Sequence, residues 1–512
     1  MRLNDLLNRA EGKPDHTTRD DDMGHMPPTG WSEQGDSAVE ITGLTADSRK
    51  VAPGYLFAAL PGARADGRSF IGDAVARGAV AVLAPQDTRL DPGLPAVKLI
   101  LEANPRQAFA RMAARFHGRQ PKTVVAVTGT NGKTSTALFT RQIWAALGRS
   151  AGSLGTLGAS APGYDRGGTL TTPDPVVLHR ILAEIADAGC DHLAMEASSH
   201  GLDQYRLDGV RVAAAAFTNL THDHLDYHGS MSDYMRAKAR LFSEILSPGG
   251  EAVLNVDDPR GEALDDLCRV RGLRVFRYGR AGSDLRLEAA TPTPTGQELA
   301  LSVLGRPFRV HLPLAGAFQA MNALAALGLV LATGAHVGRA VAALETLTGV
   351  PGRMQTVATL PSGAVALVDY AHTPDSLQTV LEALRPHATG RLVCVFGCGG
   401  DRDRTKRPLM GEIAARLSDT AIVTDDNPRT EDAATIRAAI LEACPGGIEI
   451  GDRAEAIRAG VAALRGPGDV LLVAGKGHER GQTVGGRVLP FDDATHVRDA
   501  VADCHRNGED SA

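Results

Sequence analysis

The sequence predicts an α/β protein of three domains: a small N-terminal α/β domain, a central P-loop ATPase-like α/β domain and a C-terminal Rossmann-like doubly wound domain. Three observations support this fold class. The chain has 512 residues, which corresponds to about three domains of ~150 residues each. A β-branched run, a glycine-containing turn and a helical stretch follow one another near residue 130. Four apolar segments in the last third each end in polar or glycine-rich residues, as in βαβ units.

Composition limits the classes of function. A hydrophobic content of 43% and a charged content of 22% are typical of soluble globular proteins. The net charge of −6 argues against general affinity for nucleic acid or anionic membranes. The longest apolar run, Ala323 to Ala335, is too short to span a bilayer, and no signal peptide is visible. The six cysteines are scattered without a CxxC pair, which indicates a cytoplasmic protein.

Changes in composition suggest where the domains begin and end. Residues 11 to 38 are polar and lack periodicity, so we expect residues 1–38 to be a disordered extension. The expected domains are 39–121, 122–350 and 351–512. In the first of them, strands and glycine turns alternate before a helix-like stretch. Ser48 there could contact an anionic ligand, although a serine in a turn beside a surface arginine is the reading that composition favours.

The strongest signal in the chain is Thr128 to Ser135, which reads TGTNGKTS. It stands between a predicted strand, Thr123–Val127, and a predicted helix, Thr136–Trp144. Backbone N–H groups and the positive end of a helix in this arrangement bind phosphate.

Each residue type in this turn has a chemical use. Gly129 and Gly132 let the backbone approach a phosphate, Lys133 can reach the β- and γ-phosphates, and the Thr134 hydroxyl can hold Mg²⁺. Val127 stands where the general P-loop has its first glycine, so this loop is a shortened variant. The alternative is a simple glycine turn with a surface lysine.

Acidic and histidine residues follow the next strands. Glu196 ends a predicted strand and could complete an Mg²⁺ site, or it could be a surface acid. Residues 222–228 hold three histidines and two aspartates, which suits Mg²⁺ beside phosphate better than zinc. Lys238 lies on a predicted helix and by itself would be a surface lysine. Asn322 interrupts an apolar helix, where it is either bonded internally or reads a base.

The C-terminal domain is predicted from the strands Ala364–Val368, Leu392–Phe396, Thr420–Val423 and Val470–Val473. Ligands of doubly wound sheets bind at the carboxyl ends of the strands. Charged groups gathered there would suit a zwitterion with more than one charge pair; they include Asp401, Arg402, Asp403, Arg404, Asp426, Arg429 and Glu479.

Several motifs together resemble the Mur ligases, the ATP-dependent amide ligases of bacterial cell-wall synthesis. They are TGTNGKTS, the Glu196–His200 turn, the Asp-His-Leu-Asp-Tyr-His run, the Tyr-x-x-Ala-Lys-x-x-Leu-Phe helix, Pro-Gly-Arg at 351–353 and Asp-Tyr-Ala-His-Thr-Pro at 369–374. The likeness runs in order from about Thr45 to Gly481. Asp426-Asn427-Pro428-Arg429 matches the amino-acid selectivity motif of members that add meso-diaminopimelate, and lysine-adding members lack its arginine.

The resemblance implies an activity and its participants. The enzyme would use ATP and Mg²⁺ to join meso-diaminopimelate to the D-Glu γ-carboxylate of UDP-MurNAc-L-Ala-D-Glu through an acyl phosphate, during cytoplasmic synthesis of peptidoglycan precursors. We expect a monomer without nucleic-acid partners or membrane insertion. Alternatives are a lysine-adding homologue, a folylpolyglutamate synthase-like ligase, a phosphate-loop switch or binding protein and a non-catalytic homologue.

The resemblance also assigns roles to residues. ATP would contact Gly129, Thr130, Asn131, Gly132, Lys133, Thr134, Ser135, Asn322, Arg353 and Asp369. Mg²⁺ would be held by Thr134, Glu196, His224 and Lys238, the last carbamoylated to N6-carboxylysine. The catalytic set would be Lys133, Lys238, Glu196 and His224. The nucleotide-sugar dipeptide would contact Ala46, Ser48, Thr171, Thr172, Ser198, Gln204 and Arg206. Diaminopimelate would contact Arg402, Asp426, Asn427, Pro428, Arg429, Gly475 and Glu479.

Overall fold

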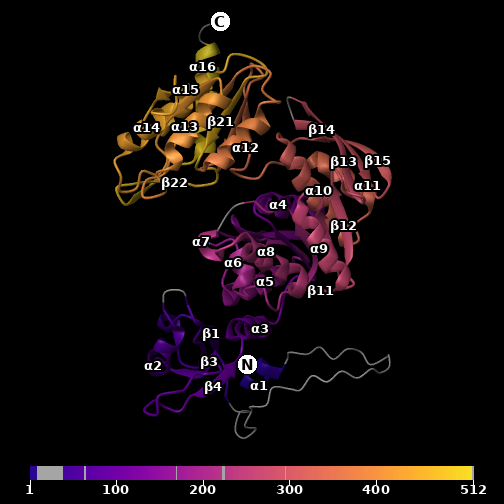
Figure 1. Cartoon of the computed structure of the whole chain (residues 1–512), viewed down its shortest axis with the longest axis vertical. Coiled ribbons are helices and arrows are strands. Elements are labelled where there is room, and N and C mark those ends of the chain that lie inside the picture. Colours follow the sequence, from indigo (N-terminus) through magenta and orange to yellow (C-terminus); the bar gives the residue numbers. More distant parts are fainter. Residues whose placement is uncertain (9–38, 63–64, 169, 222–224, 294–295, 510–512) are drawn as a thin grey trace.

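The computed structural model describes residues 1–8, 39–62, 65–168, 170–221, 225–293 and 296–509. Three α/β bodies follow one another along the long axis of the molecule, and the two chain ends lie toward its opposite ends (Figure 1). Within the described residues, their main sheets have four, eleven and six strands. The prediction of three α/β domains is therefore confirmed.

The N-terminal body is a parallel sheet in the order β1-β2-β3-β4. Helices α1 (Leu3–Asn8) and α3 supply apolar side chains to one buried cluster, and α2 supplies them to another. Its elements are β1 (Gly43–Thr45), η2 (Ser48–Lys50), β2 (Tyr55–Ala58), η3 (Gly67–Phe70), α2 (Ile71–Ala76), β3 (Ala79–Pro85), β4 (Lys98–Glu102) and α3 (Pro105–His117).

The chain begins with a short helix, α1 (Leu3–Asn8). Leu3 and Leu6 are fully buried against the first sheet, and the Met1 amino group donates to the Ile41 carbonyl at 3.0 Å. The expectation that residues 1–38 are disordered is thus wrong for residues 1–8. Six residues are too few to show helical periodicity in sequence, and the burial comes from tertiary packing. The remaining residues of that stretch, 9–38, lie outside the described residues.

The central body has an eleven-stranded sheet in the order β15-β14-β13-β12-β11-β10-β5-β9-β6-β7-β8. The seven central strands, β13-β12-β11-β10-β5-β9-β6, pair in parallel. Antiparallel strands extend the sheet at both edges, β14 and β15 on one side and β7 and β8 on the other. The strands are β5 (Thr123–Thr128), β6 (Ala151–Gly155), β7 (Gly158–Ala161), β8 (Tyr164–Arg166), β9 (His192–Glu196), β10 (Val212–Phe217), β11 (Leu246–Asn255), β12 (Arg274–Gly279), β13 (Leu285–Thr293), β14 (Gly296–Val303) and β15 (Arg306–Leu312).

Helices cover both faces of this sheet. Side chains of α4 and α10 share one buried cluster, and those of α5, α8 and α9 share another. The π-helical turn η4 continues α8 toward β11. The helical elements are α4 (Lys133–Ala146), α5 (Pro175–Asp187), α6 (Ser199–Asp203), α7 (Leu225–His228), α8 (Met231–Arg240), η4 (Leu241–Ile245), α9 (Pro259–Val270), α10 (Ala317–Ala332), α11 (Val337–Ala342) and η5 (Ala343–Thr346).

The C-terminal body is a six-stranded sheet in the order β16-β17-β21-β18-β19-β20, parallel except for β16. Helices α12 to α14 cover one face, and α15 and α16 cover the other. Its elements are β16 (Gln355–Thr359), β17 (Val365–Asp369), α12 (Pro374–Leu384), β18 (Leu392–Phe396), α13 (Lys406–Leu417), β19 (Thr420–Val423), α14 (Ala433–Leu441), β20 (Ile448–Glu449), α15 (Arg453–Ala462), β21 (Val470–Ala474), β22 (Gly481–Val484), β23 (Arg487–Pro490) and α16 (Asp493–Glu509).

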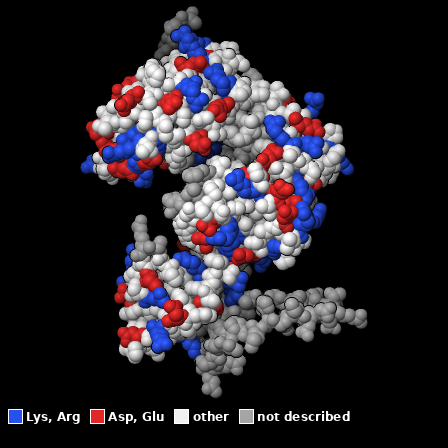
Figure 2. Space-filling model, in the orientation of Figure 1, with Lys and Arg blue, Asp and Glu red and all other residues white. Residues whose placement is uncertain are grey.

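The surface carries charges of both signs. Figure 2 shows Lys and Arg interspersed with Asp and Glu over the visible face of all three bodies. None of the described helices has the length and hydropathy that a bilayer crossing requires. All six cysteines are unpaired, and Cys394 and Cys398 are buried.

Candidate functional site

The phosphate loop between β5 and α4 is held by the segment that follows β10. Asn219 accepts from the Thr130 N–H with its carbonyl at 2.8 Å and from the Asn131 N–H with its side-chain oxygen at 2.9 Å. The Thr218 hydroxyl donates to the Asn131 carbonyl at 2.6 Å. Gly129 has a φ of 149°, and a Cβ there would collide with Thr218. The loop is therefore preorganised before any ligand binds.

Lys133 begins α4 and folds back over the loop. Its Nζ donates to the carbonyls of Gly129 at 2.9 Å and Thr130 at 2.8 Å. A phosphate can replace these acceptors because the amine stands at the helix N-terminus, where anions bind. Ser135 is buried in the first turn of the same helix.

Glu196, at the end of β9, lies against this loop. The carboxylate is buried, and its Oε1 accepts from the Thr134 hydroxyl at 3.0 Å and from the Thr156 N–H at 2.8 Å. The sequence predicts that Glu196 and Thr134 share one site, and the structure brings their side chains into contact. Thr156 comes from the β6–β7 turn, and nothing in its sequence context marks it.

The donor set at this point is oxygen, which suits Mg²⁺. Within the described part of the chain, no group of three or more His, Cys, Asp or Glu side chains could hold a metal ion unaided. A cation beside Glu196 would thus need further oxygens from phosphate, water or a modified side chain. His224 and most of the predicted histidine–aspartate cluster lie outside the described residues.

Helix α8 presents Lys238 to the loop. Lys238 is 1% exposed, its Nζ donates to the Gly129 carbonyl at 2.7 Å, and it lies 4.3 Å from the centre of the Tyr234 ring. The Tyr234 hydroxyl is 3.3 Å from the Thr130 hydroxyl. Residue type alone favours a surface position for Lys238, whereas the structure buries it beside the loop, where the resemblance also places it, because the i, i+4 spacing of Tyr234 and Lys238 directs both toward the loop.

Asn322 reaches the loop from α10. It is buried, it donates to Gln319 Oε1 at 3.0 Å, and it lies directly beside Gly132. The same helix begins at the C-terminal body, where the Gly316 N–H donates to His387 Nε2 at 3.0 Å. Burial lowers the pKa of His387, which keeps this nitrogen an acceptor.

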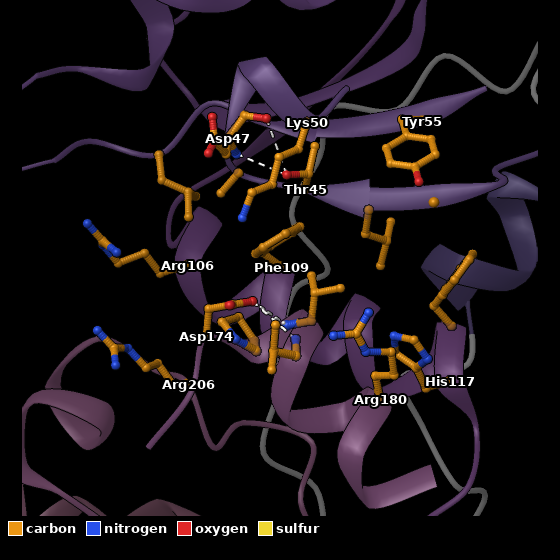
Figure 3. Close-up of a pocket in the computed structure, with 18 of the residues that line it drawn as sticks. Thr45, Asp47, Lys50, Tyr55, Arg106, Phe109, His117, Asp174, Arg180 and Arg206 are labelled. Atoms are coloured by element: carbon orange, nitrogen blue, oxygen red, sulfur yellow. Dashed lines mark hydrogen bonds between the residues drawn. The ribbon is translucent and has the colours of Figure 1, made fainter. Parts of the chain in front are cut away.

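A cavity of about 600 Å³ lies between the N-terminal and central bodies. Cations predominate in its lining, because Lys50, Arg106, Arg180 and Arg206 outnumber the acids Asp47 and Asp174 (Figure 3). Of the predicted substrate contacts, Ala46, Gln204 and Arg206 line it. Ser48 lies in η2 at its border, beside Arg49, which pairs with Asp47 at 2.8 Å and is 84% exposed. The excess of positive charge suits an anionic ligand.

Predicted substrate contacts connect this cavity to Glu196. The Thr172 hydroxyl donates to the Glu196 carbonyl at 3.1 Å and accepts from the Ser198 N–H at 3.1 Å. Arg206 donates to the Thr172 carbonyl at 2.6 Å and to Gln204 at 2.8 Å. Thr171 completes the chain by its hydroxyl contact of 3.0 Å with Thr156. One hydrogen-bonded path therefore runs from the cavity to the phosphate loop.

A second polar centre lies at the strand ends of the C-terminal body. Asn427 Nδ2 donates to Glu479 Oε2 at 2.9 Å. Lys476, which is fully buried, donates to Asn427 Oδ1 and to Glu479 Oε2, each at 3.0 Å. Asp426 is buried beside Gly475, and its Oδ2 has no hydrogen-bond partner among the residues that the structure describes. Sequence identified Asn427, Glu479 and Asp426 but not Lys476, since a lysine in a glycine-rich turn is ordinarily exposed.

Arg429 stands next to this centre in a left-handed conformation with a φ of 54°. Its Nη1 donates to the Gly400 carbonyl at 2.7 Å. Asp401, with a φ of 53°, accepts from the Thr430 N–H and hydroxyl. Arg429 and Asp401 thus both have a strained backbone, and they lie in two loops that contact each other. Such strain in non-glycine residues indicates a functional constraint. Arg402 is exposed and donates to the Asp401 carbonyl. In the other loop, Pro428 separates Asn427 from Arg429.

Arg353 and Asp369 meet at the start of the C-terminal body. The guanidinium of Arg353 lies 4.7 Å from the centre of the Tyr370 ring. Asp369 accepts from the N–H groups of Met354 and Ala371, each at 2.7 Å. Burial raises the pKa of Asp369 despite the nearby Arg353 charge. In this structure the carboxylate therefore anchors the turn that carries Arg353.

Comparison with known families matches three successive segments of the chain. Residues 40–117 match the profile described as Mur ligase family, catalytic domain. Residues 127–330 match the Mur ligase middle domain, and residues 352–477 match the Mur ligase, glutamate ligase domain.

Individual relatives cover nearly the whole chain. A UDP-N-acetylmuramoyl-L-alanyl-D-glutamate--2,6-diaminopimelate ligase of Caulobacter vibrioides is 56% identical over 90% of this chain and 95% of its own length. The protein of the same name from Agrobacterium fabrum is 53% identical over 91% of this chain and 94% of its own. A solved structure under that enzyme name aligns with a TM-score of 0.72 at 34% identity, covering 93% of this chain and 97% of the other.

Proposed function

The chain belongs to the Mur ligase family, and we propose that it joins meso-diaminopimelate to the D-Glu γ-carboxylate of UDP-MurNAc-L-Ala-D-Glu with consumption of ATP. The observation that carries the chemistry is the 3.0 Å bond between Thr134 and the buried Glu196 at the phosphate loop. The choice of substrates is supported by the names of the relatives that are 53–56% identical.

The reaction has two steps. The γ-carboxylate attacks the γ-phosphorus of ATP, which forms an acyl phosphate and releases ADP. An unprotonated amine of diaminopimelate then attacks the acyl carbon, and the amide forms as the nitrogen loses a proton and inorganic phosphate leaves. Activation by ATP is needed because a carboxylate is a poor electrophile with no usable leaving group.

The residues at the loop bind and orient the triphosphate. The N–H groups of residues 129–135 would surround the β- and γ-phosphates, and Lys133 would exchange its carbonyl acceptors for phosphate oxygen. Thr134, Glu196, His224 and a carbamoylated Lys238 would hold Mg²⁺, which when bound neutralises charge on the transferring phosphoryl group. Carbamoylation would turn the buried amine of Lys238 into a carboxylate and add the oxygen ligands that the described side chains lack. Asn322, Arg353 and Asp369 would contact the nucleoside.

The remaining substrates would occupy the two other centres. The diphosphate of the nucleotide sugar suits the cationic cavity, and its peptide would follow Thr171, Thr172 and Ser198 toward the loop. Diaminopimelate would bind among Asp426, Asn427, Arg429, Gly475 and Glu479, with Arg402 at the rim. Its extra carboxylate, compared with lysine, needs a cation, for which arginine is the best partner. We place the enzyme in the cytoplasm and treat it as a monomer.

A coupled assay of ADP release tests this function. We expect ADP release only when UDP-MurNAc-L-Ala-D-Glu and meso-diaminopimelate are both present, and none from Lys133→Ala. Efficient turnover with lysine would identify a lysine-adding enzyme, and turnover with a reduced folate and glutamate would identify a folylpolyglutamate synthase. ADP release without either cell-wall substrate would reject the proposal.

A further inference from the structure

Lys476 is a charged side chain without solvent contact. It follows β21 in the turn 475–479, and its relative exposure is 0%. The flanking glycines have φ values of 122° and 56°, and a Cβ at Gly477 would lie 2.7 Å from that of Tyr370. This left-handed turn directs Lys476 inward. Because a buried ammonium is costly unless its hydrogens are bonded, the surrounding acceptors matter.

One of the acceptors of Lys476 is the side-chain amide of Asn427, whose orientation this bond helps to fix. Asn427 Oδ1 accepts from Lys476 Nζ at 3.0 Å and from the Thr483 N–H at 2.9 Å. Two donors on one side leave the Nδ2 end to face Glu479 Oε2, 2.9 Å away. A lysine can only donate, so a flipped amide would place its NH₂ group against Nζ. Lys476 and the Thr483 N–H together therefore exclude the other amide orientation.

The same ammonium holds Glu479. Oε2 accepts from both Lys476 and Asn427, whereas Oε1 makes no hydrogen bond within the part of the chain that the structure describes. Burial pushes the pKa of Glu479 upward, but the hydrogen bonds from Asn427 and Lys476 outweigh it, so the pKa lies below its usual value. The other titratable groups facing this carboxylate are His478, Tyr370 and Arg453.

An ionised oxygen is thus left for a ligand. Glu479 is 34% exposed at its side chain, and the unpartnered Oδ2 of Asp426 lies by the same turn. Two carboxylate oxygens without donors at the strand ends suit an ammonium group, which has three hydrogens to donate.

We propose that Lys476 is a positioning residue for the incoming amino acid: with the Thr483 N–H it orients the Asn427 amide, and it holds Glu479 by Oε2, so that Oε1 is directed at an ammonium group of diaminopimelate. The inference rests on the proposed function and deepens it. Lys476 itself touches no substrate in this arrangement, so its loss affects the amino acid through its two partners.

The test compares Lys476→Met with the wild-type chain in steady-state kinetics. Loss of a charge-assisted hydrogen bond of this kind corresponds to about tenfold or more in KM for diaminopimelate. The KM values for ATP and for the nucleotide-sugar dipeptide should stay near wild type. Since Glu479 would then titrate at a higher pH, the acid limb of kcat/KM for diaminopimelate should move upward.

Two further variants complete the design. Lys476→Gln keeps an N–H donor without the charge, so it should reproduce the pH shift even if the methionine variant does not fold. Lys122→Met is the matched control, because Lys122 is 81% exposed and pairs with Asp191 far from this turn. Thermal melts of all variants accompany the kinetics.

The outcomes separate the two proposals. A selective rise in KM for diaminopimelate with the pH shift supports the inference. Wild-type KM and pH profile in both Lys476 variants, or an equal rise in all three KM values, overturns it and leaves the function standing. A wild-type chain that does not use diaminopimelate overturns both.

Discussion

Removal of the Asp493 carboxylate should destabilise the C-terminal body. Asp493 and Arg453 are both fully buried and form a bidentate pair, with Nε–Oδ1 and Nη2–Oδ2 distances of 2.7 Å. In Asp493→Ala, the acceptors left to Arg453 in the described part of the chain are the carbonyls of Ala474 at 3.0 Å and Asp425 at 3.4 Å. Breaking one partner of a buried pair costs about 3–5 kcal/mol, because the other charge stays buried without compensation.

Thermal unfolding measures this cost. For a folding unit of 150–250 residues, each kcal/mol lowers Tm by about 2–4 °C, so we expect a drop of roughly 6–20 °C. Because Asp493 begins α16, proteolysis near the C-terminus should also increase. Asp499→Ala, an exposed position on the same helix, is the matched control and should melt like the wild type.

A double variant checks the cause. Replacing the pair by Arg453→Met with Asp493→Leu removes both charges and fills the space, which is often neutral for stability. We therefore expect it to recover most of the lost Tm. A single variant Asp493→Ala that melts with the wild type, or a double variant that is no better than the single one, would refute this account of the pair.

Three other predictions concern separate parts of the chain. Burial lowers the pKa of His179 to about 4, so the unfolded chain takes up its proton first, and about 3 kcal/mol of stability should disappear as the pH falls from about 6.5 to 4; His179→Gln should lose this component of the pH dependence in urea titrations, and an unchanged slope would contradict the assignment. Arg429→Ala should lower kcat/KM for diaminopimelate about ten- to a hundredfold without producing efficient use of lysine; unchanged diaminopimelate kinetics would remove Arg429 from the binding site. Leu6→Ala should cost about 2–5 kcal/mol in denaturant unfolding, since Leu6 is fully buried, and a wild-type midpoint would mean that α1 adds nothing to the core.

The regular α/β units could be predicted from the sequence. The strand expected at Leu392–Phe396 matches β18, and the strand, turn and helix around Lys133 lie where the motif needs them. These features depend on local apolar runs and glycine positions, which periodicity detects. Glu196 was also predictable, because the carboxyl end of a neighbouring parallel strand must approach the loop.

Contacts between distant segments could not be predicted in this way. Thr156 lies beside Glu196 because β6 pairs in parallel with β9, and the sequence does not show which strands become neighbours in the sheet. The burial of Lys476 depends on two left-handed glycines and on Tyr370 from another strand end. The packing of α1 depends on a sheet formed after residue 40. In each case the deciding term is tertiary packing, which overrides local propensity and residue type.

Helix α10 has a mechanical consequence. Asn322 touches the phosphate loop at Gly132, and six residues earlier Gly316 is bonded to His387 of the C-terminal body. At 1.5 Å per residue, Gly316 and Asn322 are about 9 Å apart along one continuous helix. Rotation of the C-terminal body about Gly316 would therefore displace Asn322 against the loop at Gly132, and a nucleotide bound to this loop, as proposed above, would resist that rotation. Faster hydrogen exchange at the Gly316 amide in nucleotide-free protein than in nucleotide-bound protein would reveal this coupling, and equal rates would argue against it.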